Sequence, residues 1–468
     1  MEFKHVIFLL GFLTCVPAGA LAASFSARAR DVLFLSLIFG TALSHRLSIN
    51  FFSREWYRGS TVGMEISFVD FLTLALLIGV LVDAWRRRLP LFWPPALLPM
   101  LLYLGWSLFS ILTNTPMLFG LLELTKLLRG LLVFLAVSFY VREPYHLKLF
   151  LFGLLSVLLM QTTVALHDRY ILGLHRIGAT LGHPNSLSLY VSMITPIAIA
   201  ASLARIPRWF QLLSLLAAFG GLICVLLTIS RTGVVTIAFV SLGAALASQQ
   251  FHFSSRRLLA IALAFLVALG LFYKAKDTVL SRFQSRSLAM EYSSQGKEGR
   301  GVYFRLANEI YRHQPLGVGL NNWSYAVSNT YGRLQGFGYV PYIDAHQVPD
   351  QQIPYRSGLD AAQAAPAHNL IALTLGEVGI PGLILFLLLW ARWFSLAIPF
   401  LWRRSPELPY RLGVGLLFAL VAVFMQSGTE WIFRQTNIFF LFHLMLGVLA
   451  SLVWHHRTTF PSFSRTSS

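Results

Sequence analysis

A single histidine, His368, stands where the longest polar interval of the chain, residues 274–367, gives way to an apolar block. It lies in the segment "PAHNLI", between Ala367 and Asn369. An imidazole can take a proton from a hydroxyl group near neutral pH, which is the step that activates a sugar hydroxyl as an acceptor. We therefore predict a catalytic role for His368; the alternative is that it only caps or hydrogen-bonds the start of a helix.

Three arginines have the chemistry to hold a phosphate group. Arg231 lies in "TISRTG" between two apolar blocks, where a guanidinium persists most easily if it snorkels to the interface or meets an anion. Arg300 and Arg305 belong to "GRGVYFRLANEIYRH", whose spacing predicts a short amphipathic helix. The forked guanidinium suits a phosphate, so we predict phosphate binding for all three. A snorkelling Arg231 and a solvated basic helix face are the alternatives.

A helix start gives two further candidates. In "LGHPNSLSLY", His183 and Asn185 precede an apolar helix, and the N-terminus of a helix can bind an anion. We predict that they help to bind phosphate. Asn185 or Ser186 could instead serve only to cap the first turn of the helix.

Charged residues inside or beside apolar blocks are weaker candidates. Lys126 and Arg129 lie one helical turn apart in "LLELTKLLRG" and could also bind a phosphate, although Glu123 can pair with Lys126. Glu430 and Arg434 are spaced i, i+4, which predicts that they pair with each other.

The composition sets the fold class. The 468 residues are 56% hydrophobic and only 12% charged, whereas a soluble domain has roughly 25% charged residues. Apolar runs of roughly 18–22 residues recur along the chain, enough to cross a hydrocarbon core of ~30 Å. We predict an all-α polytopic membrane protein with twelve or thirteen transmembrane helices. The apolar blocks after the first two runs are residues 65–83, 92–113, 119–140, 148–166, 185–204, 209–229, 233–249, 257–273, 368–401, 410–429 and 434–454.

These blocks divide the chain into three parts: transmembrane helices in 1–273, about nine or ten spans; one large outer loop in 274–367 with short helices; and three last spans with a cytoplasmic tail in 368–468. The block 368–401 is too long for one simple span, so we expect a kink at its "GIPG" segment. Residues 1–23 resemble a secretory signal, but the many later spans favour an uncleaved first helix.

Orientation follows from the placement of Lys and Arg. The basic segments fall on alternate connections between the apolar blocks. We predict that these basic connections are cytoplasmic: residues 85–90, 142–148, 205–208, 254–257, 402–411 and 455–457. The connections between them are then outside, and the long loop 274–367 is among them. The first two apolar runs leave the side of the N-terminus open.

Charge, cysteine positions and motifs indicate which partners and cofactors to expect. The net charge is +18, which fits loop topology and contact with anionic lipid head groups. Nucleic acid is not an expected partner, because no soluble basic domain is present to bind it. Cys15 and Cys224 both lie in apolar runs and are expected to be packing thiols. No zinc signature, DxD motif or phosphate-binding glycine loop occurs, so we predict no metal and no other cofactor.

The chain resembles the O-antigen ligase and polymerase-related family of polytopic glycosyltransferases. The resemblance covers roughly residues 180–400 and rests on "GHPNSL", "SRTG" at a membrane edge, "GRGVYFR" with "QPLGVGLNNW", and "AHNLIALTLGEVGIPG". It implies a GT-C-like fold and an inverting, metal-independent transfer of a glycan from undecaprenyl diphosphate. Arg231 and a loop arginine, Arg300 or Arg305, would hold the diphosphate, and His368 would activate or position the acceptor hydroxyl.

The resemblance also implies partners and a location. The donor would be an undecaprenyl-diphosphate-linked glycan, and the acceptor a glycan or lipid A–core, at the periplasmic face of the bacterial inner membrane. We expect an O-antigen ligase. A polymerase of O-antigen or exopolysaccharide is the nearest alternative, and a protein O-glycosylation ligase is a further one. A transporter or flippase is disfavoured because the sequence shows no internal repeat and its polar residues gather outside the apolar blocks.

Overall fold

The computed structural model describes residues 3–44, 47–53, 57–249, 300–337, 339, 363–403 and 405–459. The predicted apolar block 257–273 and most of the polar interval, 274–299 and 340–362, lie outside these described residues. The expected division into three parts therefore stays a prediction.

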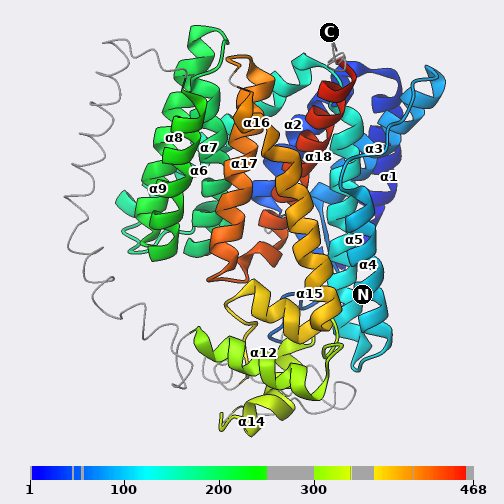
Figure 1. Cartoon of the computed structure of the whole chain (residues 1–468). Helices are drawn as coiled ribbons and strands as arrows, with labels where there is room; N and C mark the ends of the chain where they lie inside the picture. Colours follow the sequence, from blue (N-terminus) through cyan, green and yellow to red (C-terminus); the bar gives the residue numbers. More distant parts are fainter. Residues whose placement is uncertain are drawn as a thin grey trace, which may run out of the picture.

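Long helices form one bundle (Figure 1). They are α1 (Phe3–Phe25), α2 (Ala27–Leu43), α3 (Phe68–Arg86), α4 (Leu97–Leu112), α5 (Met117–Tyr140), α6 (Pro144–Tyr170), α7 (Pro184–Ser202), α8 (Arg208–Thr228), α9 (Arg231–Ser248), α15 (Leu370–Ala397), α17 (Leu408–Ser427) and α18 (Thr436–Thr459). Within the described part of the chain, nine helices are long and apolar enough to cross a membrane. These helices are consistent with the predicted all-α polytopic membrane protein, while the count of twelve or thirteen spans stays a prediction.

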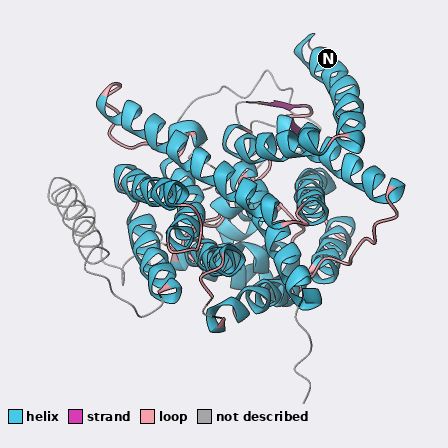
Figure 2. Cartoon of the chain, turned by 90° about the horizontal axis from the view of Figure 1, so that it is seen from above, coloured by secondary structure: helices cyan, strands magenta, loops and turns pink. Residues whose placement is uncertain are grey.

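Short elements connect the long helices. They are the helices α12 (Gly301–His313), α13 (Trp323–Ala326), α14 (Gly332–Leu334) and α16 (Pro399–Trp402), the 3-10 turns η1 (Ala179–Leu181) and η4 (Ile432–Arg434), and the π turn η2 (Val327–Tyr331). Strand β1 (Ser48–Asn50) pairs antiparallel with β2 (Glu65–Ser67), with Ile49 opposite Ile66. Figure 2 shows most long helices nearly end-on, with the strands at the periphery near the N-terminal helix.

The two ends of the bundle differ in character. Figure 1 places α12 and α14 at one end, and α16 and the C-terminus at the other. Trp85, Trp209 and Trp402 are strongly exposed near the ends of α3, α8 and α16, beside the basic connections. Exposed tryptophans of this kind anchor helices at a membrane interface. The two ends therefore fit a lipid-facing bundle with one basic, aromatic rim.

Helix α12 has the predicted amphipathic pattern. Val302, Leu306 and Ile310 recur at four-residue intervals and are buried, while Phe304 and Asn308 on other faces are exposed. The buried stripe packs against α15. This contact holds the loop helix against the helix that follows His368.

Helix α15 breaks at the expected place. Gly379 has φ 66° and ψ −172°, outside the helical region, within the "GIPG" segment. The carbonyl groups before the break accept bonds from the turn after α12: Val318 N donates to Gly376 O at 3.0 Å, and Gly319 N to Glu377 O at 2.9 Å. The short first part of α15 lies across the end of the bundle beside α12 (Figure 1). The break thus lays the start of α15, and His368 with it, along this end of the bundle.

Candidate functional site

His368 is paired with a carboxylate. Its Nδ1 lies 2.7 Å from Oε2 of Glu430, whose side chain is only 9% exposed, whereas the His368 side chain is 37% exposed. When Nδ1 carries the proton and donates it to Glu430, Nε2 is the basic nitrogen of the ring. The pair therefore has the arrangement of a base oriented by a buried acid.

Glu430 joins several chain segments at one carboxylate. Its Oε1 lies 3.3 Å from Nη2 of Arg300 and accepts a bond from Nδ2 of Asn185 at 3.0 Å. Arg300 also donates from Nε to the carbonyl of Thr429 at 2.7 Å. The starts of α7, α12 and α15 consequently meet at the turn between α17 and α18. Two of the predicted phosphate ligands and the predicted base share this carboxylate.

The predicted pairing of Glu430 with Arg434 is wrong. Residues 432–434 form a 3-10 turn, so the i, i+4 spacing of an α-helix does not apply to this segment. Arg434 donates from Nη1 to Oε2 of Glu377, and both side chains are buried. Glu430 therefore pairs with His368 and Arg300 instead of Arg434. The two acidic residues pair across the fold, with partners far away in the sequence.

Two neighbours hold His368 in place. The ring of Tyr303 stacks on the imidazole with centroids 5.8 Å apart and planes at 28°. Burial, with Tyr339 and Glu430 nearby, raises the pKa of Tyr303 to about 12, so its phenol stays neutral near pH 7. Asn369 caps α15 by accepting from Ala372 N at 2.9 Å. The capping alternative for His368 is therefore wrong, because its neighbour does the capping.

The segment "GHPN" turns out differently from its capping alternative. His183 is the N-cap residue of α7 and Pro184 its first residue, and Asn185 makes no cap bond but donates to Glu430. Ser186 donates its hydroxyl to Gln435. Burial lowers the pKa of His183, Arg176 and His368 act in the same direction, and Glu430 opposes them. His183 is thus neutral near pH 7 and within electrostatic range of the His368–Glu430 pair.

Arg231 is the first residue of α9 and is half-buried. A tight reversal precedes it, with Ile229 at φ 54° and the Ser230 side chain accepting from Gly233 N. Gly233 lies against α7, since a Cβ at this glycine would come within 1.9 Å of Ser188 Oγ. The start of α9 therefore lies beside the first turns of α7, which carry Asn185.

Arg176 is a further cation near these elements. Its Nε lies 3.5 Å from the carbonyl of Thr228, at the end of α8, and its charge influences His183. It therefore lies beside the reversal before Arg231 and within electrostatic range of His183 at the start of α7. Arg305, on α12, has its guanidinium 6.0 Å from the centroid of the Phe337 ring. Of the two loop arginines, Arg300 is the one in contact with Glu430.

Lys126 and Arg129 are both bound to carboxylates. Lys126 Nζ lies 2.7 Å from Oε2 of Glu123, and both residues are buried. Arg129 forms a bidentate ion pair with Asp70. Its Nε donates to Oδ1 and its Nη2 donates to Oδ2, each at 2.7 Å. The predicted Glu123–Lys126 pair is confirmed. These contacts fit a structural role, in which α5 is tied to α3 and to the loop before it.

Three residues of the site escaped prediction from the sequence: Glu430 as the partner of His368, Tyr303 as its stacking neighbour, and Arg176. Glu430 did carry a signal, because it is the only carboxylate in the connection between α17 and α18, residues 428–435. A carboxylate at the edge of an apolar block is a candidate partner for any nearby base. Tyr303 and Arg176 gave no such signal, since their roles depend on contacts between distant segments.

Among the residues that the structure describes, no three His, Cys, Asp or Glu side chains gather into a possible metal site. The carboxylate of Glu430 is instead surrounded by cationic and amide groups. The charges of this cluster are suited to an anion and to proton transfer.

A comparison with known families bears on the class of protein. Residues 215–387 match the family model described as O-antigen ligase. This match supports an O-antigen ligase-related family. It also supports an O-antigen ligase-like function in general. The matched range includes Arg231, Arg300, Arg305 and His368, whereas His183 and Glu430 lie outside it. No curated protein matches the chain.

Proposed function

We propose that the protein transfers a glycan from undecaprenyl diphosphate to a sugar hydroxyl, as an O-antigen ligase with lipid A–core as acceptor. The observation that carries this proposal is the His368–Glu430 pair with Arg300 on the same carboxylate. A base and a phosphate-binding cation side by side are what transfer from a lipid diphosphate requires.

In the proposed reaction, Nε2 of His368 takes the proton of the acceptor hydroxyl as its oxygen attacks the anomeric carbon of the donor sugar. The bond from that carbon to the diphosphate oxygen breaks, and the diphosphate leaves with the electron pair. Attack from the side opposite the leaving group inverts the anomeric configuration. Glu430 holds the imidazole at Nδ1 and stabilises it once it is protonated.

Negative charge on the departing diphosphate has to be stabilised. We assign this to Arg300 and Arg231, with Arg176 and the start of α7 at His183 and Asn185 beside them. Guanidinium groups fixed before the reaction stabilise developing charge at little reorganisation cost. Arg305 has a lesser role in this proposal, and Lys126 and Arg129 act as structural cations. The proposal gives the stabilising role to these guanidinium groups and needs no metal ion.

We further propose that the site faces the periplasm at the inner membrane and that the fold is GT-C-like. The α12 end of the bundle would carry the donor head group and the acceptor. The basic, tryptophan-rich end would then face the cytoplasm, as expected from the placement of Lys and Arg.

A deletion strain tests the function. Loss of all polymer from lipid A–core, with carrier-linked polymer accumulating, is the result expected for a ligase. A single repeat unit on the core would instead identify a polymerase. Normal glycan length and attachment would contradict both.

Variants of the pair test the mechanism. His368→Ala is expected to lower kcat by ~10²–10⁴-fold, the usual contribution of a general base. Glu430→Gln keeps the shape but removes the charge, so we expect kcat to fall at least ~10-fold with the KM for the donor little changed. The matched control is Glu407→Gln. The side chain of Glu407 is paired with Arg205 and is 50% exposed. Full activity of a folded His368→Ala protein would rule out the proposed base.

A further inference from the structure

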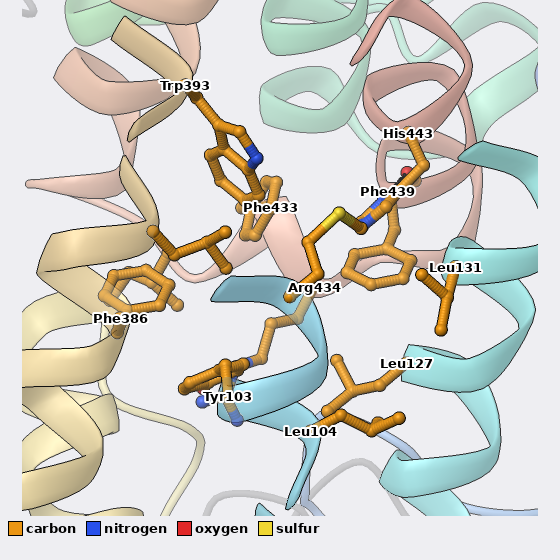
Figure 3. Close-up of a pocket in the computed structure, with 13 residues that line it drawn as sticks. Tyr103, Leu104, Leu127, Leu131, Phe386, Trp393, Phe433, Arg434, Phe439 and His443 are labelled. Atoms are coloured by element: carbon orange, nitrogen blue, oxygen red, sulfur yellow. Dashed lines mark hydrogen bonds between the residues drawn. The ribbon is translucent and has the colours of Figure 1, made fainter. Parts of the chain in front are cut away.

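Two arginines are buried among the residues that the structure describes, and they differ in their partners. Arg434 is 5% exposed and Arg411, near the start of α17, is 3% exposed. Figure 3 shows Arg434 reaching toward Tyr103 between apolar side chains, and its guanidinium is paired with Glu377. The side chain of Arg411 makes no ion pair and no hydrogen bond in the described part of the chain, and its Nε is enclosed without a partner. Arg411 is therefore a buried cation without a counter-ion from these residues.

Other cations inside the bundle have a carboxylate. Lys126, Arg129 and Arg434 each have a nitrogen within 2.7 Å of a carboxylate oxygen. The acidic residue nearest to Arg411 in the sequence is Glu407, which is half exposed and pairs with Arg205. An unpaired charge in the interior is strongly destabilising. Arg411 therefore needs an anion that the described residues do not supply.

Arg411 lies against the last turn of α7. A Cβ at Gly415 would come within 2.5 Å of the Cα of Ile197, on α7. In the connections beyond, Arg205 N donates to Pro406 O at 2.7 Å. Arg411 lies between these two points along the chain and shares a helix face with Gly415, four residues later. Helical side chains lean toward the start of their helix, so this one leans toward the basic end of the bundle.

Capping of α7 does not account for the buried charge. An arginine can donate to the last carbonyl groups of a helix. At the end of α7, Ser202 donates its hydroxyl to Ile199 O at 2.7 Å. Leu203 N donates to Ala200 O at 3.3 Å. Arg411 donates to no carbonyl group of the described residues.

The connections beside Arg411 are basic and aromatic. Residues 202–212 and 402–412 together contain five arginines and one glutamate. Trp209 and Trp402, in the same segments, are 60% and 81% exposed. Exposed tryptophans of this kind lie at a membrane interface. Arg411 is thereby placed just inside the bundle at the depth of lipid head groups.

We propose that Arg411 binds the phosphate group of an anionic phospholipid between α7 and α17. A guanidinium can bind two phosphate oxygens at once. Basic pockets between transmembrane helices are known sites for anionic lipid head groups. This proposal does not depend on the reaction proposed above, because Arg411 lies at the opposite end of α17 from Glu430.

The bound lipid acts on the pair of helices. Asn185 at the start of α7 and Glu430 after the end of α17 are joined by a hydrogen bond of 3.0 Å. A phosphate at Arg411 holds the other ends of the same two helices. A ligand that binds only the folded protein stabilises it, so anionic lipid is expected to raise the unfolding temperature.

Thermal unfolding of Arg411→Met tests the site, because the effect of this change depends on the lipid. In an uncharged detergent without lipid, the variant should unfold at the same temperature as the wild type or higher, since it lacks the unpaired charge. Added phosphatidylglycerol should raise the unfolding temperature of the wild type and leave that of the variant unchanged. An arginine with a purely structural role would give a less stable variant in both conditions.

Native mass spectrometry of the full chain measures lipid binding directly. The affinity for the first phosphatidylglycerol molecule should fall at least about tenfold in Arg411→Met. Arg411→Lys keeps the charge and loses the fork, so its affinity should lie between the two, and it serves as the test if Arg411→Met folds poorly. The matched control is Arg208→Met, at an exposed arginine in the neighbouring connection, which should bind within about twofold of the wild type.

Each contrary outcome has a definite meaning. Wild-type affinity in Arg411→Met, or in Arg411→Lys where Arg411→Met does not fold, would overturn the site. An equal loss in Arg208→Met would show that diffuse surface charge binds the lipid. Equal binding of phosphatidylcholine would overturn the assignment to an anionic lipid. Stabilisation by inorganic phosphate as large as that by phosphatidylglycerol, and lost in Arg411→Met, would assign the site to free phosphate instead of a lipid.

Discussion

At the scale of single residues, the site depends on one shared carboxylate. Glu430 receives His368 on one oxygen and Arg300 with Asn185 on the other. A buried carboxylate needs such partners, because an unpaired charge in the interior is strongly destabilising. The same contacts orient the imidazole ring of His368 and the guanidinium group of Arg300. The same contacts therefore account for both the stability and the geometry of the proposed catalytic site.

The structure distinguishes the two loop arginines that the sequence left equivalent. Arg300 contacts Glu430 and Thr429, whereas Arg305 lies over Phe337. Arg300→Lys keeps the charge but loses the fork, so we expect kcat/KM to fall by roughly 10- to 100-fold. Arg305→Lys is expected to change it by less than roughly threefold. Transfer assays of both variants with a lipid-linked donor provide the measurement, and the opposite order would contradict the assignment.

At the scale of elements, the break in α15 determines where His368 lies. If residues 370–397 formed one straight helix, its first turns would continue along the helix axis and would not lie across the end of the bundle. Gly379 provides the break, and the turn 315–319 binds the carbonyl groups that the break exposes. Trp106 on α4 adds a bond from its Nε1 to Val378 O at 2.9 Å. The loop, the membrane helix α4 and the start of α15, which follows His368, are thus joined through backbone groups.

Gly379→Ala tests this element. The conformation at φ 66° and ψ −172° is one that essentially only glycine adopts, and a Cβ there would lie 2.3 Å from Pro315 O. We expect a loss of stability of at least ~1–3 kcal/mol from backbone strain alone, with reduced transfer activity.

The control is Gly105→Ala, inside α4, where a Cβ would meet nothing within 4 Å. This change should be neutral or stabilise by up to ~1 kcal/mol. Thermal unfolding in detergent measures both variants. Equal melting temperatures for Gly379→Ala and Gly105→Ala would show that the break is not needed.

At the scale of the whole molecule, polarity is distributed between the two ends of the bundle. The α12 end gathers the His368–Glu430 site, and the other end carries exposed tryptophans beside basic connections. Because Lys and Arg gather in the connections at that other end, it is expected to stay in the cytoplasm. The orientation of the site follows from that choice.

Cysteine labelling tests this orientation. In a background without Cys15 and Cys224, Thr113→Cys, at the end of α4, should react in intact cells with an outer-membrane-permeant thiol reagent that does not cross the inner membrane. Arg208→Cys, at the start of α8, should react only after the inner membrane is permeabilised. Both positions are exposed, so access is decided by the membrane. The reverse pattern would place the site in the cytoplasm.

The sequence by itself determined the general class of protein, the positions of the long helices that the structure describes, the amphipathic helix and the break at "GIPG", and it marked His368 as a candidate base. These follow from hydrophobic length, periodicity and local backbone chemistry, which act over a few residues. Only the tertiary structure decided the partners of the charged residues. Glu430 pairs with His368, Glu377 with Arg434 and Asp70 with Arg129. The two residues of each pair are 50 or more positions apart in the sequence. Such pairs depend on how helices pack, because a buried charge takes the partner that the fold brings near it.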